Sequence, residues 1–193
     1  MKKRHLSLFI CSIIGSMLGC TSLESRMTIE PYTKNTQMRN ALEQIASGYC
    51  EKMRTDLDTS KPVKQPDFIF TSDGCTRWPN DSWLSCCIVH DITYWCGGSE
   101  QDRKDADQDF KQCVNKKMQV MGDVMYSGVR IGGSPWLPTP WRWGYGWKHW
   151  PNGYEQLNDT ASVKKLLDML KIHDLVEQHL LNNDEGYGAT QRE

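Results

Sequence analysis

Eight cysteines in a chain of 193 residues constrain the fold of this sequence more than any other feature. Disulfides formed by them would restrict the chain to a few topologies, but disulfides persist mainly outside the reducing cytosol. The N-terminus therefore decides how the cysteines are interpreted. A positive cluster, Lys2, Lys3 and Arg4, precedes an apolar run of 13 residues, 6–18. That run has the length of a signal-peptide core and is too short to span a bilayer comfortably.

The apolar run ends in the motif M-L-G-C at residues 17–20, which resembles the bacterial lipobox, where the cysteine is lipidated and becomes the new N-terminus. This motif predicts a signal peptide over residues 1–19, lipidation of Cys20 and a polar tether over residues 20–35. A buried N-terminal helix is the alternative, and it fits poorly because charges directly abut an uncapped apolar run. Thr21 follows the cysteine in place of aspartate, which favours the outer membrane. We therefore expect a lipid-anchored envelope protein that faces the periplasm or the cell surface.

Composition is consistent with a single domain over residues 36–193. The aromatic content of 10%, with eight tryptophans, excludes low-complexity disorder for most of the chain. A net charge of −1 without a long basic run argues against nucleic acid as the main partner. Cys11 leaves with the signal peptide and Cys20 carries lipid, so six cysteines remain for disulfides, which allow 15 pairings.

Apolar spacing predicts a mainly helical domain. Apolar residues at three- and four-residue steps predict an amphipathic helix over residues 36–53, capped by Asn35 or Thr36. A last amphipathic helix is expected over residues 161–182. Between the two, residues 122–158 are rich in Gly, Pro and Trp, show no clean period, and are expected to form an irregular extension.

Two further helices are predicted in the middle of the chain. The first is capped by Asn80 or Asp81 and runs to about Trp95, where two glycines end it. A capping-box pattern over residues 99–102 opens the next helix, which is expected to run to about Val120.

The residues that carry chemistry lie on the helix that ends near Trp95. Cys86, His90 and Tyr94 are spaced i, i+4, i+8 and therefore share one face. Cys87 and Asp91 lie on the adjoining stripe. A histidine beside an aspartate, on a helix held by two half-cystines, indicates a base next to a cation ligand.

The pattern C-C-x-x-H-D-x-x-Y, followed by an aspartate six residues before another cysteine, resembles the active-site helices of secreted phospholipase A2. The resemblance covers residues 70–118. It implies a mainly α, disulfide-bonded domain with two antiparallel active-site helices. It also implies that His90 is the general base for a water, that Asp107 orients His90, that Tyr94 supports this network and that Asp91 binds Ca²⁺.

The resemblance also implies further calcium ligands and the disulfide pairing. Calcium takes six to eight oxygen ligands, and the remaining ones would be backbone carbonyls of an upstream loop: Gly74, Thr76 and Trp78. Of the 15 pairings, the resemblance implies three disulfides: Cys86–Cys113, Cys75–Cys87 and, from the two cysteines that remain, Cys50–Cys96.

With Cys86 bonded to Cys113 on an antiparallel helix, the register of the proposed site can be checked. His90 lies roughly 6 Å along the axis from its cysteine, and Asp107 roughly 9 Å from its own, at 1.5 Å per residue. The two displacements run the same way, so Asp107 can lie opposite His90 and accept its ring N–H. The neighbouring acids, Asp105 and Asp109, point to other faces of the helix.

Two features remain open from the sequence. Five tryptophans within residues 136–150 fit a membrane-interface surface, a site for envelope sugars, or core packing beneath a loop. His149, His173 and His179 show no zinc-ligand spacing and are expected to be surface or packing residues.

The preferred interpretation is calcium-dependent hydrolysis of a glycerophospholipid acyl ester at a phospholipid membrane. The alternatives are a non-catalytic lipid- or envelope-binding lipoprotein with the same fold, and an acyl hydrolase that acts on another envelope ester. The complete set of one histidine and two aspartates favours an enzyme, because a binding module need not retain all three.

Overall fold

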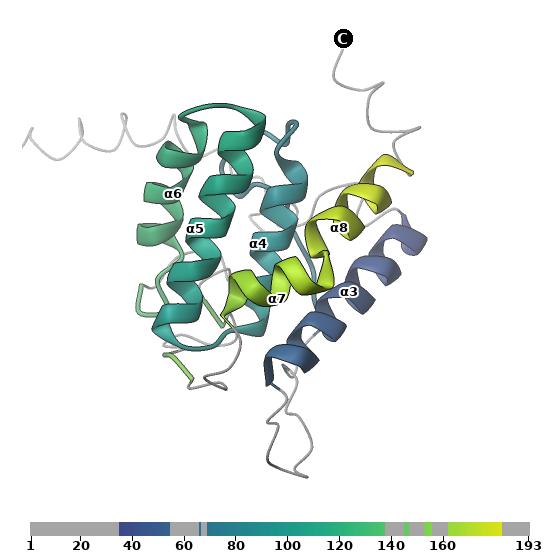
Figure 1. The fold of residues 1–193 in the computed structure, drawn as a ribbon, viewed down its shortest axis with the longest axis horizontal. Helices are drawn as coiled ribbons and strands as arrows, with labels where there is room; N and C mark the ends of the chain where they lie inside the picture. Colours follow the sequence, from purple (N-terminus) through teal and green to yellow (C-terminus); the bar gives the residue numbers. More distant parts are fainter. Residues whose placement is uncertain are drawn as a thin grey trace, which may run out of the picture.

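The computed structural model describes residues 35–54, 66, 69–137, 145–146, 153–155 and 162–182. Within these residues the fold is all-α, with six helices and no strands (Figure 1). The helices are α3 (Thr36–Arg54), α4 (Leu84–Cys96), α5 (Glu100–Lys117), α6 (Met121–Gly132), α7 (Val163–Leu170) and α8 (Ile172–Leu181). The expectation of a mainly α, disulfide-bonded fold is confirmed. The expected signal peptide and Cys20 lie outside the described residues.

The N-terminal helix follows the sequence pattern closely. Of the two cap candidates, Asn35 is the one used, because its Oδ1 accepts a hydrogen bond from the Met38 N–H at 2.9 Å. The predicted apolar positions of α3 face the core: Met38, Leu42, Tyr49 and Met53 are buried, and Ile45 packs against the core.

Helix α4 begins at Leu84, later than either predicted cap. Asn80 is occupied elsewhere, since its Oδ1 accepts a hydrogen bond from the Cys75 N–H at 2.9 Å and fixes the preceding loop. The carbonyl of Asp81 accepts from the Leu84 N–H at 2.8 Å, which makes residues 81–84 a turn before the helix. The predicted end is correct, because Gly97 follows the helix with φ of 74°, a conformation that glycine adopts without strain.

The capping box at the start of α5 is confirmed. Ser99 Oγ accepts from the Asp102 N–H at 3.1 Å, and Asp102 Oδ2 accepts from the Ser99 N–H at 2.8 Å. Helix α5 ends at Lys117, three residues before the expected end, and only three residues separate it from α6.

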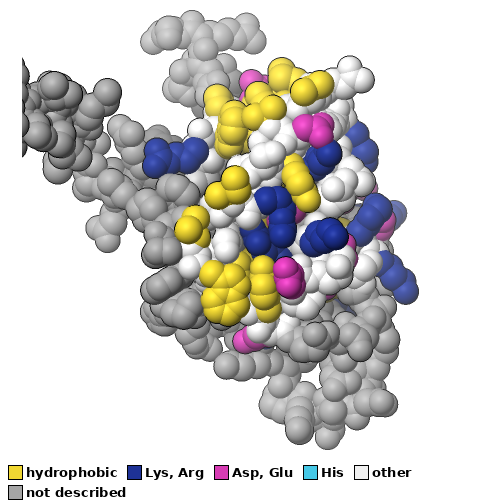
Figure 2. Space-filling view, turned by 90° about the vertical axis from the view of Figure 1, so that its left-hand side faces the viewer, with side chains coloured by type: hydrophobic (Ala, Val, Ile, Leu, Met, Phe, Trp, Pro, Cys, Tyr) yellow, Lys and Arg dark blue, Asp and Glu magenta, His cyan; other side chains and the backbone are white. Residues whose placement is uncertain are grey.

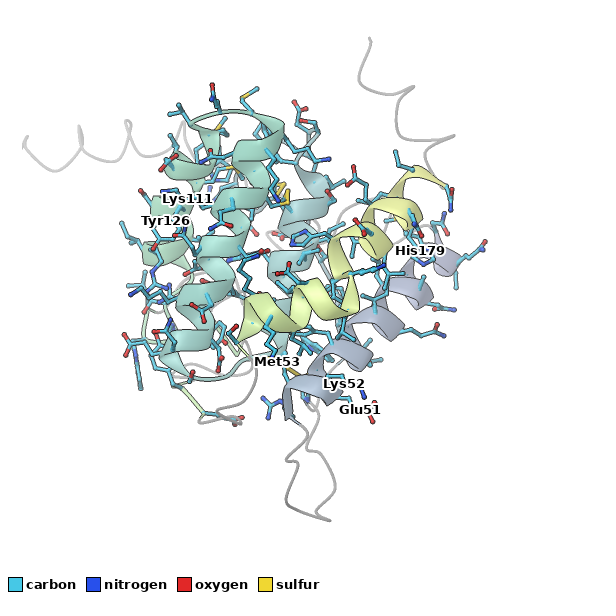
Figure 3. All side chains as sticks on the ribbon, in the orientation of Figure 1. Glu51, Lys52, Met53, Lys111, Tyr126 and His179 are labelled. Atoms are coloured by element: carbon cyan, nitrogen blue, oxygen red, sulfur yellow. A yellow bond between two sulfur atoms is a disulfide. The ribbon has the colours of Figure 1, made fainter. Side chains whose placement is uncertain are left out.

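Helix α6 corrects the expectation that residues 122–158 are irregular. Its apolar stripe, Met121, Met125 and Val129, is partly obscured in the sequence by glycines, which are poor helix formers. One of them has a packing reason: a Cβ on Gly122 would lie 2.2 Å from the Lys111 carbonyl oxygen. The glycine therefore lets α6 approach α5 closely. Lys111 also lies over the Tyr126 ring at 5.5 Å, a contact between the same two helices (Figure 3).

The C-terminal helical segment is two helices rather than one. Lys171, with φ of 52°, separates α7 from α8, which turn away from each other (Figure 1). On one straight helix Ile172 would lie about 140° around the axis from Leu167, at 100° per residue. Both side chains are nevertheless buried, as is Val176. The break at Lys171 allows both apolar stripes to reach the core.

Three disulfides cross-link the described residues, and they are the three pairs expected: Cys50–Cys96, Cys75–Cys87 and Cys86–Cys113. A larger apolar core lies among α3, α4, α7 and α8. A smaller one surrounds two of the disulfides and includes Trp83, Phe110, Val114 and Met125. Within the described residues, no helix is both long and apolar enough to cross a bilayer.

Candidate active site

Helices α4 and α5 bring His90 and Asp107 into contact. His90 Nε2 lies 2.8 Å from Asp107 Oδ1, as the register from the Cys86–Cys113 disulfide predicts. Both side chains are buried, with 8% of His90 and none of Asp107 exposed to solvent. The rings of Tyr94 and Phe110 have centroids 4.1 Å and 4.7 Å from that of His90. The imidazole is therefore held by a carboxylate at one edge and by two aromatic rings.

The partners of Asp107 determine its charge and the tautomer of His90. Burial by itself would raise the pKa of Asp107, but hydrogen bonds from His90, Tyr94 and Arg130 lower it below its usual value. An ionised carboxylate only accepts hydrogen bonds, so the Tyr94 hydroxyl at 2.7 Å and His90 Nε2 both donate to Oδ1. Neutral His90 with its hydrogen on Nε2 has a lone pair on Nδ1. That nitrogen is the one that can accept a proton from water.

Two arginines join this network, and neither was predicted from the sequence. Arg130 of α6 donates from Nη1 to Asp107 Oδ2 at 2.5 Å. Arg103 of α5 is buried and donates from Nε to the Tyr94 hydroxyl at 3.1 Å. The four-residue spacing from Arg103 to Asp107 was a signal that they share a helix face. No such signal existed for Arg130, because α6 itself was not predicted.

Asp91, on the adjoining stripe of α4, faces the loop that precedes the helix. Its Oδ2 accepts a hydrogen bond from the Ser72 hydroxyl at 2.5 Å, and the Ser72 oxygen in turn accepts from the Gly74 N–H at 3.0 Å. Ser72 is fully buried and was not singled out in the sequence, although it directly precedes the Asp-Gly turn. These contacts fix Asp91 against the predicted calcium loop.

The loop itself has a well-defined conformation. Gly74 and Arg77 have φ values of 73° and 68°, a region that glycine adopts freely and other residues rarely. The Thr76 hydroxyl donates to the Asp73 carboxylate at 2.7 Å, and a disulfide ties Cys75 to α4. The three predicted carbonyl ligands lie on this loop and line the same cavity as Asp91: Gly74, Thr76 and Trp78.

The donor set fits a hard cation bound by oxygen. Burial, together with the nearby carboxylate of Asp73, raises the pKa of Asp91 well above its usual value, despite the Ser72 hydrogen bond. A cation placed beside Asp91 would relieve this destabilisation of the charged form. Among the described residues no group of three or more His, Cys, Asp and Glu side chains is arranged to hold a metal. A cation bound beside Asp91 would have to take most of its ligands from backbone carbonyls of the loop, which calcium accepts.

His90 and Asp91 open into one cavity of about 180 Å³. Its walls come from the loop at residues 74–78, from α4 and α5, and from the inner face of α6. Apart from the polar pair, the lining is largely apolar and includes Trp78, Phe110 and Met125. A cavity with a candidate base, a candidate cation ligand and largely apolar walls suits an ester that carries an aliphatic chain.

The other acidic residues of α5 are placed as expected, away from His90. Asp109 Oδ2 lies 2.6 Å from His173 Nε2 of α8, and Asp105 accepts from the Gln101 amide at 2.8 Å. His173 is therefore part of a helix–helix contact. His179 is half-buried on α8 (Figure 3), and His149 lies outside the described residues.

Of the five clustered tryptophans only Trp136 belongs to the described residues. It is 57% exposed and lies edge-on to the Tyr154 ring, with centroids 6.1 Å apart. The other four lie outside the described residues, so the alternatives for this segment remain open. Comparisons of the chain with protein-family models, curated proteins and solved structures found no match.

Proposed function

We propose that this chain hydrolyses an acyl ester of a glycerophospholipid in a calcium-dependent reaction, on a phospholipase A2-like helical domain. The observation that carries the proposal is the contact between His90 Nε2 and Asp107 Oδ1, 2.8 Å long, at the wall of a cavity that also contains Asp91. This arrangement presents a base and a candidate cation ligand to the same small volume, while the orienting carboxylate of Asp107 is buried behind the base.

The chemistry follows from the tautomer of His90. A water in the cavity gives one proton to Nδ1 while its oxygen bonds to the ester carbonyl carbon. The tetrahedral intermediate then breaks its bond to the alcohol oxygen, which takes the proton from Nδ1. The products are a fatty acid and a lysophospholipid. Asp107 stays ionised throughout and stabilises the transient imidazolium.

The residues that would hold calcium are Asp91 and the carbonyls of the loop at residues 74–78. Calcium bound there would polarise the ester carbonyl and stabilise negative charge on its oxygen. Ser72 and the Cys75–Cys87 disulfide orient these ligands, because they fix the loop against α4.

A lipid substrate is supported by the surface around α6. Of the large apolar side chains that are exposed among the described residues, most lie between residues 118 and 137: Met118, Val120, Val124, Ile131, Trp136 and Leu137. Figure 2 shows apolar side chains spread over this face, with Lys and Arg side chains among them. Apolar groups next to cations suit the interface of an anionic phospholipid bilayer. The expected lipid on Cys20 would hold this domain near such a membrane at high effective concentration.

The deciding experiment measures fatty-acid release from phospholipid vesicles with calcium or with a chelator. The variant is His90→Gln, and His173→Gln is the matched control, since it also removes a histidine paired with an aspartate, outside the cavity. We expect calcium-dependent release by the wild type and the control, and a loss of about 10²–10⁴-fold in His90→Gln. Equal release by all three proteins would refute the mechanism. Vesicle binding without release by the wild type would favour the alternative of a non-catalytic lipid-binding lipoprotein.

A further inference from the structure

Arg103 is a buried charged residue to which the proposed reaction gives no role. Only 3% of its side chain is exposed. Its Nη2 donates to the carbonyls of Val129 and Arg130 at 3.0 Å and 2.7 Å, its Nε to the Tyr94 hydroxyl, and its Nη1 to the Tyr154 hydroxyl at 3.3 Å. Such a set of contacts holds a side chain in one conformation.

The two carbonyls identify what Arg103 does to α6. Helix α6 ends at Gly132, so Val129 and Arg130 belong to its last turn. The last four carbonyls of a helix lack partners within the helix and carry the negative end of its dipole. The Val129 carbonyl also accepts from the Gly133 N–H at 2.9 Å, so the guanidinium adds a second donor there and is the donor described for the Arg130 carbonyl. A buried guanidinium at this end satisfies both needs. Arg103 therefore fixes the C-terminal turn of α6 against α5.

Arg130 lies on that same turn and reaches back to the site. Its Nη1 bonds Asp107 Oδ2, while His90 and Tyr94 bond the other oxygen, Oδ1. The side-chain torsion that rotates an aspartate carboxylate has only broad preferences. A carboxylate held at one oxygen can turn about this torsion, but one held at both oxygens cannot. The orientation of Asp107, and with it that of the His90 ring, is therefore set from α4 and α6 together.

We propose that Arg130 is a positioning residue for His90, acting through Asp107, and that Arg103 is the buried anchor that delivers it by fixing the last turn of α6. The inference rests on the proposed function for its kinetic consequence, but the orientation of the His90 ring is independent of turnover. Arg103 contributes a second effect, because its Nε lies 3.9 Å from Asp107 Oδ2. The two cations keep Asp107 a hydrogen-bond acceptor that cannot donate.

The test compares Arg130→Gln and Arg130→Lys with the wild-type chain. Arg39→Gln is the control, because Arg39 is half-buried on α3, does not line the cavity, and its side chain pairs with Glu43 of the same helix. Two quantities are measured: kcat and KM on phospholipid vesicles with calcium, and the ¹⁵N chemical shifts of the His90 ring at one fixed pH. We expect kcat to fall on the order of 10–100-fold in Arg130→Gln with KM changed less, as for other partners that orient a catalytic group. Arg130→Lys restores part of the loss, since lysine can still donate to Oδ2.

The ring signals decide the inference separately from catalysis. In the wild type they should show a single tautomer with hydrogen on Nε2, and in Arg130→Gln they should shift towards a mixture. In Arg103→Lys the His90 ring signals should lie between those of the wild type and those of Arg130→Gln. Lysine is chosen because it keeps a positive charge at this buried position. Unchanged ring signals in Arg130→Gln overturn the inference, whether or not the wild type hydrolyses lipid. Absence of hydrolysis by the wild type, with the ring signals shifted as expected, refutes the proposed function and leaves the positioning role supported.

Discussion

The three disulfides offer a prediction in which stability and activity separate. The Cys50–Cys96 bond closes 46 residues and joins α3 to the end of α4, away from the cavity. The Cys75–Cys87 bond closes only 12 residues and ties the candidate calcium loop to α4. Replacing both cysteines of one pair by alanine removes the loop-closure constraint on the unfolded chain.

The expected losses follow from the loop lengths. At 25 °C the chain-entropy relation gives about 4.0 kcal/mol for the closure between Cys50 and Cys96, and about 2.8 kcal/mol for that between Cys75 and Cys87. All four cysteines are buried, with 4% exposure or less, so the loss of side-chain contacts is similar in both variants. The Cys50–Cys96 variant should therefore lose about 1.2 kcal/mol more stability than the Cys75–Cys87 variant.

Activity should change in the opposite order. Loss of the Cys75–Cys87 bond frees the loop that carries the candidate calcium ligands, whereas the Cys50–Cys96 variant keeps that loop cross-linked. Urea unfolding gives the two free energies at matched slopes, and vesicle hydrolysis over a calcium titration gives the activities. If the Cys75–Cys87 variant is the less stable one, the loop-length reasoning is wrong. If that variant keeps wild-type calcium dependence, the assignment of this disulfide to the site is wrong.

Four further changes test other parts of the structure. Gly133→Ala places a Cβ 2.5 Å from the Tyr94 ring, so we expect about 1–3 kcal/mol less stability in urea and a lower kcat. The pKa of Asp107 is lowered in the folded state, so its ionised form stabilises the fold above pH 3.8, and this stabilisation is lost as the pH falls through the folded-state pKa. Asp107→Asn should therefore have a lower unfolding free energy than the wild type at neutral pH. The difference between the two unfolding free energies should narrow below pH 3.8. Calcium at 100 times its Kd should raise the unfolding free energy of the wild type by about 2.7 kcal/mol and that of Asp91→Asn by much less, as thermal unfolding with and without chelator would show. Ile131→Asp, at a position 71% exposed on α6, should weaken sedimentation with anionic vesicles while hydrolysis of a soluble short-chain ester persists; equal loss of both would contradict a role confined to the membrane surface.

The correct predictions from the sequence relied on residues at fixed, short spacings along the chain. The helical period places Cys86, His90 and Tyr94 on one face. Only a short link joins α4 to α5, which favours packing of one helix against the other. Once a disulfide sets the register, Asp107 must lie opposite His90. The capping box at Ser99 is equally local, because both of its hydrogen bonds form within four residues.

The predictions that failed depended on contacts with residues outside the predicted helix. Asn80 reads as a helix cap until Cys75 takes its side-chain oxygen, and α4 then starts only at Leu84. Gly122 is a poor helix former in the sequence. In the structure its missing side chain lets α6 pack closely against α5. In both cases the local propensity was real, and a tertiary contact outweighed it.

The sequence by itself therefore determined the helical class and the candidate base with its orienting aspartate. All of these follow from residue types at fixed short spacings. Only the tertiary structure decided that α6 closes the site, that Arg130 holds the second oxygen of Asp107, and that Arg103 anchors both. These contacts join residues 23 and 27 positions apart, Asp107 to Arg130 and Arg103 to Arg130, across separate helices. No sequence periodicity predicts these contacts of Arg130, because they depend on how closely α5 and α6 pack.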